Sequence, residues 1–132
     1  MSANPRRSKD GPLGQARPRR KAPSLSRTRP PSGMSLEQWQ IERRRQFGRA
    51  QDFRMTNAGD EPVFSEFLVT NPSSRRTYLV RIRGTEPGAN VCSCPDFASN
   101  ELGTCKHVEF VIGRLARGRK TAKLLREGFE PP

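Results

Sequence analysis

The feature that most constrains the fold of this chain is a cluster of cysteine and histidine residues in one short segment. All three cysteines and the only histidine lie between positions 92 and 107. They form a C-x-C pair and a C-x-H pair separated by ten residues: Cys92, Cys94, Cys105 and His107. Paired Cys/His spacing of this kind is typical of metal ligands. The pattern therefore predicts that a metal ion organises this part of the chain.

The donor set favours zinc. Zn²⁺ accepts thiolate sulfur and imidazole nitrogen, and its structural sites are nearly always tetrahedral with four protein ligands. Soft thiolates argue against magnesium and calcium, and an iron–sulfur cluster normally uses four cysteines. Iron is the remaining metal alternative. We expect Zn²⁺ as the cofactor, in a site closed by the four residues.

Two interpretations without a metal stand beside this one. A disulfide between Cys92 and Cys94 would close a strained loop, and an odd number of cysteines leaves one thiol unpaired. Three buried structural cysteines beside a surface histidine is the other alternative. The first 33 residues contain no apolar segment of a secretory signal, which predicts a reducing, cytoplasmic location.

The same motif carries a resemblance to a known family. C-x-C, a variable spacer and C-x-H is the signature of SWIM-type zinc fingers, and the four residues match its ligand positions. Segments 61–72, 92–97 and 102–110 also look like the N-terminal accessory region of bacterial Swi/Snf-type helicases, where a SWIM finger precedes the motor. The resemblance covers about residues 35–132, and the sequence stops at Pro132 where such proteins continue into an ATPase.

This resemblance implies a function, a location and partners. It implies a zinc-binding module that binds DNA, as an accessory region of or partner to a Swi/Snf-type DNA-dependent ATPase. The implied location is the bacterial cytoplasm, with association to the nucleoid. The alternative is a zinc-stabilised protein–protein interaction module that docks on a helicase motor or another chromosomal protein without contacting nucleic acid.

Composition leaves room for only a small core. Hydrophobic residues make up 32% of the chain and the mean hydropathy is -0.84. A structural zinc site contributes on the order of 10 to 16 kcal/mol of apparent binding energy that is coupled to folding. We therefore expect a small zinc-stabilised domain that loses its shape without the ion.

The chain divides near Gly33. Residues 1–33 hold nine Lys and Arg against one acid, with six prolines, and this composition predicts a disordered basic tail. Residues 34–132 form the predicted SWIM-type domain, with a finger core at 90–118. Translation from Met34 is an alternative, because the first signal of folded structure follows it directly.

The first predicted element is a helix from Leu36 to about Phe53. Ser35 and Gln38 form a capping box, and apolar residues recur at mostly helical spacing, although Gly48 weakens the pattern. The arginines at 43–45 and 49 indicate either a solvated face or a surface for DNA phosphate.

A β-hairpin is predicted next. Segments 63–70 and 77–84 are rich in β-branched and aromatic residues, and residues 71–74 supply turn chemistry. Tyr78, Val80 and Ile82 alternate with Leu79, Arg81 and Arg83, so one face should pack against a helix while the other stays wet and basic.

The metal segment completes the predicted fold. Cys92 and Cys94 should point the same way along a strand or knuckle, and Cys105 should sit in the turn before a helix that ends at Gly118. A second short helical stretch is expected around 121–127. The fold class is thus α+β, in the order helix, hairpin, zinc knuckle, helix.

Enzymatic function is not expected. A hydrolytic zinc centre keeps one coordination position open for water, whereas four protein ligands fill the shell. Asp96 and Glu109 are predicted to be a turn residue and a helix-surface charge. No zinc deaminase signature or P-loop is present, so we expect no small-molecule substrate.

Charge favours a polyanionic partner. The net charge is +12 and the pI is about 11.1, which is typical of proteins that bind DNA, and we expect no membrane partner. The candidate phosphate contacts are Arg75, Arg76, Arg81, Arg83, Arg114, Arg117, Arg119 and Lys120.

Overall fold

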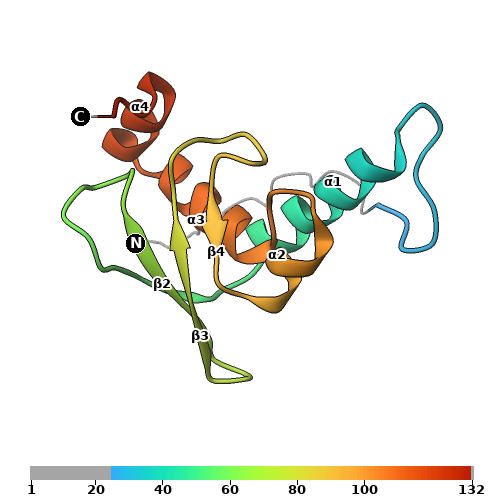
Figure 1. Ribbon diagram of the computed structural model, residues 1–132, viewed down its shortest axis with the longest axis horizontal. Coiled ribbons are helices and arrows are strands. Elements are labelled where there is room, and N and C mark those ends of the chain that lie inside the picture. The colour runs from blue at the N-terminus through green and yellow to red at the C-terminus, as the bar shows by residue number, and fades with distance from the viewer. Residues whose placement is uncertain (1–24, 132) are drawn as a thin grey trace, which may run out of the picture.

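Eight elements follow one another along the chain. They are α1 (Leu36–Arg49), β1 (Arg54–Asn57), β2 (Glu66–Asn71), β3 (Arg76–Arg81), β4 (Val91–Cys92), α2 (Pro95–Asn100), α3 (Lys106–Arg117) and α4 (Arg119–Glu127). The computed structural model describes residues 25–131. Within that range the fold is α+β as predicted, with one four-stranded antiparallel sheet and four helices (Figure 1).

The sheet is built around the predicted hairpin, although β2 starts at Glu66 rather than at 63 and β3 ends at Arg81 rather than at 84. Its strand order is β1-β2-β3-β4, and each neighbouring pair is antiparallel. Phe67 pairs with Val80, and Val80 pairs in turn with Cys92. All three side chains are buried on one face of the sheet. The predicted alternation along β3 is confirmed, because Leu79 and Arg81, on either side of the buried Val80, are exposed on the opposite face of the sheet.

The first helix is shorter than predicted, and the strand after it was not predicted. α1 ends at Arg49, with Ala50 as its C-cap. Phe53 is buried outside the helix and packs its ring against Phe110, with centroids 5.2 Å apart. Release from the helix lets residues 54–57 pair along the edge of β2. The burial of Phe53 and the pairing of residues 54–57 with β2 thus outweigh the helical spacing of apolar residues that predicted a longer helix.

The helix α3 lies at the centre of the molecule. It packs on the buried face of the sheet, and α1 and α4 pack on it from other sides (Figure 1). Residues from Val108 to Ile112 are all buried, together with Leu115. A helix buried nearly all round is a core helix rather than a surface helix. Most of the hydrophobic core therefore forms where α3 meets the sheet.

The crossing of α1 and α3 requires a glycine. A Cβ placed on Gly48 would clash with the carbonyl oxygen of Lys106 and lie 3.1 Å from Cβ of Glu109. The residue that interrupts the helical sequence pattern is thus the one that lets two backbones approach closely. The predicted capping box is only half formed: Ser35 Oγ accepts a hydrogen bond from the Gln38 amide at 3.0 Å, but the Gln38 side chain donates to Glu42 instead.

Part of the predicted tail contacts the folded domain. Residues 1–24, which carry most of the disorder prediction, lie outside the described residues. The segment 25–33 returns along α1, where Trp39 Nε1 donates to the carbonyl oxygen of Ser26 at 2.9 Å. The Leu25 amide donates to Gln46 Oε1 at 3.2 Å.

Two short helices flank α3 along the chain, α2 before it and α4 after it. α2 was not predicted, because its six residues are too few to show a hydrophobic period. α4 begins two residues earlier than the predicted stretch at 121–127 and ends before Gly128, as expected. Leu125 anchors α4 to the core, and Thr121 Oγ1 donates to the carbonyl oxygen of Leu115 at 2.5 Å.

Candidate metal centre

Four residues from three elements meet beneath the sheet. Cys92 ends β4, and Cys94 is the N-cap of α2. Cys105 is the N-cap of α3, and His107 lies in the first turn of that helix. Cys105 therefore precedes the helix proper, as the spacing of the C-x-H pair predicted. We call this set of four the Cys3His cluster.

The geometry of the cluster fits a tetrahedral ion. The four candidate ligand atoms all lie within 4.8 Å of one another. Nδ1 of His107 is 3.8 Å from Sγ of Cys92 and 3.9 Å from Sγ of Cys105. Zn–S bonds of about 2.3 Å and Zn–N bonds of about 2.0 Å in a tetrahedron place sulfur and nitrogen about 3.5 Å apart. Only small shifts separate the observed distances from that value.

The cluster is shielded from solvent. The exposed fraction is 4% or less for each of the four residues. The ring of His107 lies between those of Tyr78 and Phe53, with centroid distances of 4.8 and 5.5 Å. Buried thiols and a buried imidazole need polar or metal partners, and here they face one another. The alternative with a surface histidine is therefore wrong.

The thiols do not ionise alike. Contact with the thiols of Cys105 and Cys92 lowers the pKa of Cys94 well below its ordinary value. The pKa of Cys105 is raised, first by contact with the thiol of Cys92, next by contact with that of Cys94, and then by burial. For Cys92, the contact with Cys105 lowers the pKa, but Cys94 and burial outweigh it and raise the pKa to about 12. Three thiolates this close would repel one another, and a divalent cation bound between them would remove that cost, because coordination to a metal deprotonates a cysteine thiol.

Backbone contacts hold the first cysteine pair in place. The Ser93 amide donates to the carbonyl oxygen of Leu79, and Ser93 Oγ accepts from the Leu79 amide at 2.9 Å. The Phe97 amide donates to Sγ of Cys94 at 3.4 Å. These contacts fix the knuckle to β3 and orient the Cys94 sulfur toward the other donors.

The spacer between the pairs closes through two turns. Asn100 closes its second half, since Nδ2 donates to the carbonyl oxygen of Thr104 and Oδ1 accepts from the Leu102 amide. Gly103 has a φ of +78° and would place a Cβ 2.5 Å from the Gly88 nitrogen. The Gly88 amide instead donates to the Gly103 carbonyl oxygen at 2.9 Å. Glycine at 103 is therefore required by both the positive φ and the close approach.

Glu109 is a buried charge, which corrects the prediction of a helix-surface residue. It is 1% exposed, and its Oε2 accepts from Thr104 Oγ1 at 2.7 Å. Its Oε1 is 3.3 Å from Nε of Arg45 and 3.4 Å from a terminal nitrogen of Arg49. The carboxylate thus joins α1, α3 and the turn before Cys105. The i, i+4 spacing of the two arginines is the sequence signal that could have indicated it.

Asp96 forms a second link to α1. Both carboxylate oxygens accept from Arg44 at 2.9 Å, which makes a bidentate pair. The hydrogen bonds from Arg44 hold the pKa of Asp96 below its ordinary value. Asp96 lies in the first turn of α2, where a negative charge also suits the helix dipole. The arginines at 44, 45 and 49 are therefore each paired with an acid, while the side chain of Arg49 remains 46% exposed.

The structure separates the eight candidate phosphate contacts into two groups. Arg81 and Arg83 both bind Glu66, and Arg114 binds Asp52. In the described part of the chain, the other five are exposed and have no ion pair: Arg75, Arg76, Arg117, Arg119 and Lys120.

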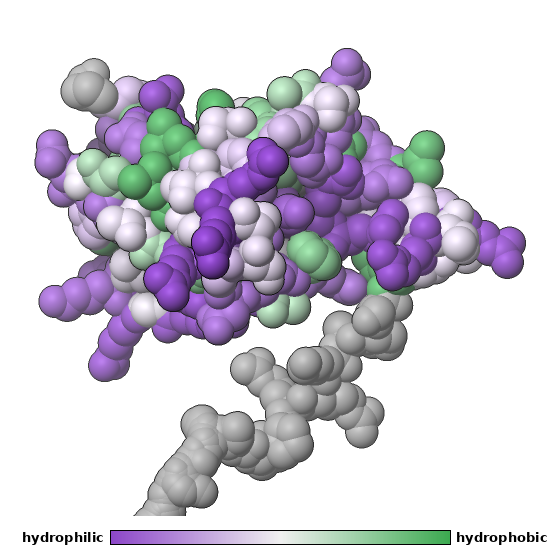
Figure 2. All heavy atoms as spheres, turned by 90° about the horizontal axis from the view of Figure 1, so that it is seen from below, coloured by the Kyte–Doolittle hydropathy of each residue, from purple (hydrophilic) through white to green (hydrophobic). Residues whose placement is uncertain are grey.

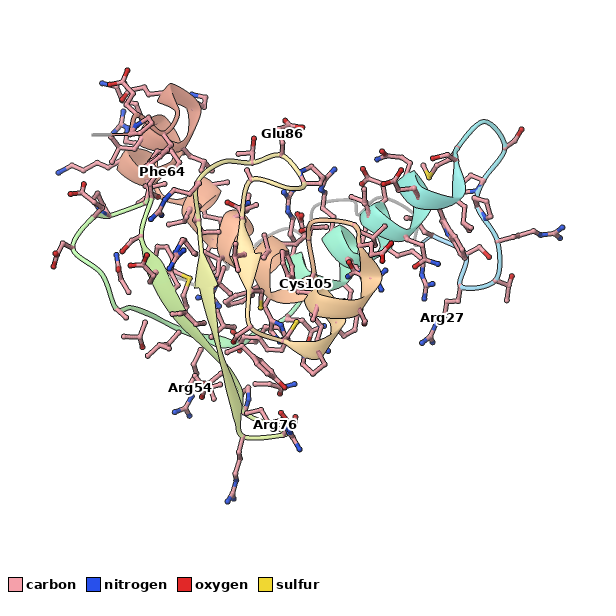
Figure 3. The ribbon with its side chains drawn as sticks, viewed as in Figure 1. Arg27, Arg54, Phe64, Arg76, Glu86 and Cys105 are labelled. Carbon is pink, nitrogen blue, oxygen red and sulfur yellow. The ribbon has the colours of Figure 1, made fainter. Side chains whose placement is uncertain are left out.

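These five residues do not form one surface. Arg75 and Arg76 lie at the turn of the hairpin, at the lower end of Figure 3. Arg117, Arg119 and Lys120 lie where α3 passes into α4, at the opposite end in Figure 1. α4 adds two further exposed cations that the sequence analysis did not select as contacts, Lys123 and Arg126. The face seen in Figure 2 is largely hydrophilic, with small separate apolar patches.

Comparison with known proteins gave no match to a family model, a curated protein or a solved structure. None of the helices in the described range has the length and apolar character needed to cross a membrane. The function must therefore be argued from the Cys3His cluster and from the charged surface.

Proposed function

We propose that this chain is a zinc-stabilised, non-catalytic module of the SWIM type that binds DNA. The observation that carries the proposal is the Cys3His cluster, whose four donor atoms lie within 4.8 Å of one another. Three sulfurs and one nitrogen suit Zn²⁺ better than magnesium or calcium, which prefer oxygen ligands. Zinc bound by four protein ligands leaves no position for a reacting water, so its contribution is to folding.

The role of the ion follows from what the cluster connects. Its ligands come from the end of β4, the start of α2 and the start of α3. Bound zinc would fix the sheet, the spacer loop and the central helix to one another. The spacer otherwise depends mainly on polar contacts, because α2 contains no fully buried residue and is tied to α1 by the Asp96–Arg44 pair.

DNA contact is assigned to the cations around α4. Arg117, Arg119, Lys120, Lys123 and Arg126 are exposed and free of acidic partners within the described residues. Cations that are already paired must give up a carboxylate before they bind phosphate, whereas these five need not. Binding to phosphates by these cations would not depend on the base sequence of the DNA. Such binding suits an accessory region of, or partner to, a Swi/Snf-type motor.

Salt dependence of duplex binding tests the proposal. If about five phosphates are neutralised, the logarithm of the affinity should fall with the logarithm of salt concentration with a slope of about −4.5. Fluorescence anisotropy of a labelled duplex measures this slope. No binding at low salt, or binding that is indifferent to salt, would reject DNA as the partner.

A charge-matched pair of variants locates the surface. The double variant Arg119→Gln with Lys120→Gln should reduce the slope by about 1.8, because two phosphate contacts are lost. The control, Arg75→Gln with Arg76→Gln, removes the same charge from the hairpin turn and should leave the slope unchanged. Equal effects of the two variants would show that only net charge matters and would contradict the assignment to α4.

A second candidate function is protein–protein interaction. The outer face of the sheet exposes Leu68 and Leu79, which are direct cross-strand partners, each 39% exposed. Val91 on β4 adds a third apolar side chain, 51% exposed. Substitution Leu79→Ser would weaken such docking, and it should leave the salt-dependent affinity for duplex unchanged.

A further inference from the structure

A hollow at the opposite end of the molecule from α4 is not used by the proposed duplex contact. It has a volume of about 580 Å³ and lies between α1, the segment that returns beneath it, and the starts of α2 and α3. This size is within the range of about 300–1,000 Å³ typical of ligand sites. Arg27, one of its lining residues, extends below α1 in Figure 3.

The hollow is strongly positive. Four cations line it, on residues 27, 43, 44 and 106. Among the described residues, Asp96 is the only acid in the lining, and Arg44 already binds both of its carboxylate oxygens. Arg27, Arg43 and Lys106 form no ion pair within the described range. Three uncompensated positive charges thus face one open space, which favours an anionic ligand.

The hollow also presents an aromatic ring. Phe47 lines it and is 51% exposed, so its ring is accessible from the hollow. Nζ of Lys106 lies 5.6 Å from the centroid of its ring. An acidic peptide would need only the cations and would make no use of an exposed aromatic face. A nucleotide uses both, because its base stacks on the ring while its phosphate binds the cations.

We propose that this hollow, lined by Phe47, Arg27, Arg43 and Lys106, binds an unpaired nucleotide of single-stranded DNA. The base stacks on Phe47, and the flanking phosphates contact the three cations. The inference rests on the proposed DNA-binding function and extends it, because α4 lies on the opposite side of the molecule from α1, whose residues line the hollow (Figure 1). The protein then has separate contacts for duplex and for single strand.

The test compares two exposed phenylalanines. Phe47→Ala should weaken binding of a labelled oligothymidylate about 5- to 100-fold, as expected for one stacked base. Phe129→Ala is the matched control, because Phe129 is 38% exposed and has the Arg83 guanidinium 5.0 Å from its ring centroid. It lies outside the lining of the hollow and should leave the affinity unchanged. Phe47→Trp, which keeps an aromatic face, should restore binding.

Salt dependence separates stacking from charge. Phe47→Ala should lower the affinity at every salt concentration without changing the slope. Arg27→Gln with Arg43→Gln should reduce the slope by about 1.4, since each phosphate contact to a single strand contributes about 0.7. Thermal unfolding of each zinc-loaded variant checks that the fold is retained.

The outcomes distinguish this inference from the proposed function. Unchanged single-strand affinity in Phe47→Ala, or an equal loss in Phe129→Ala, overturns the inference while α4-dependent duplex binding stands. Binding of free deoxynucleoside monophosphate with no binding of the oligonucleotide also overturns it, as does preference for an acidic peptide over the oligonucleotide. Absence of binding to both DNA forms rejects the proposed function itself.

Discussion

At the scale of single residues, the four candidate ligands are the part of the site that sequence could predict. Their spacing selected them, because residues two apart on an extended segment point the same way, and paired Cys/His residues of this kind are typical of metal ligands. The structure places Cys94 and Cys105 at N-cap positions, where the chain is extended before a helix starts. Two of the four ligand residues thus lie where the backbone changes direction.

The first prediction concerns one ligand. Cys105→Ser should reduce the zinc content to well below one ion per chain and abolish cooperative unfolding, because serine is a poor ligand and the metal energy is coupled to folding. Elemental analysis and thermal unfolding monitored by circular dichroism measure both effects. Ser99→Ala, an exposed change in the same loop, is the control and should retain the ion. Full zinc content in Cys105→Ser would exclude this cysteine as a ligand.

The second prediction concerns Glu109. Glu109→Gln should lower the free energy of unfolding of the zinc-loaded protein by about 1–3 kcal/mol, because the buried carboxylate accepts from Thr104 and two arginines. Urea denaturation measures the change. Glu127→Gln removes the same charge from the exposed surface of α4 and should change stability by less than about 0.5 kcal/mol. Similar losses in both variants would show that Glu109 contributes only net charge.

Sequence reasoning missed Glu109 for a physical reason. The apolar positions at 108, 111, 112 and 115 define a stripe, and Glu109 lies beside it, where a surface helix would face water. α3 is instead covered on that side by α1. Burial on a second face depends on a partner helix, and the periodicity of one helix does not show that partner.

At the scale of elements, the predictable parts were those with a local signal. The cap at Ser35, the hairpin and the stop at Gly118 each follow from residues close in sequence. β1 and α2 carry no such signal, because one is a four-residue edge strand and the other a six-residue helix. Their conformations are set by pairing with β2 and by the closure of the spacer loop.

The third prediction compares two glycines at the crossing of α1 and α3. Gly48→Ala should destabilise the protein by about 1–3 kcal/mol, because its Cβ would clash with the backbone of Lys106. Gly113→Ala should change stability by no more than about 1 kcal/mol, since its Cβ would meet only the side chain of Arg49, at 3.1 Å, and alanine favours the helix. Urea denaturation of the two variants measures the difference. A Gly48→Ala protein as stable as Gly113→Ala would contradict the close crossing.

At the scale of the whole molecule, the account makes the ion the link between sheet and helices. The hydrophobic core centres on α3, and the three cysteines belong to it. The charged contacts of Asp96 and Glu109 then attach α1 to the two segments that carry ligands. Unfolding caused by loss of the ion should therefore extend beyond the ligand-bearing segments to the crossing of α1 and α3.

The fourth prediction is that chelation affects both structure and DNA affinity. Removal of zinc should unfold the domain and raise the dissociation constant for duplex, because α4 is held in place through α3. Anisotropy titrations before and after chelation measure the change, and re-addition of zinc should restore the affinity. Duplex affinity that survives in chelated, unfolded protein would show that binding does not need the fold.

The most direct test of the central claim is elemental analysis of the purified protein combined with circular dichroism before and after chelation. The account predicts one zinc ion per chain and a loss of helical signal when a strong chelator removes it, with recovery on addition of zinc. A protein that contains no stoichiometric zinc, or whose spectrum is unchanged by the chelator, would contradict the claim that the Cys3His cluster holds an ion that organises this fold.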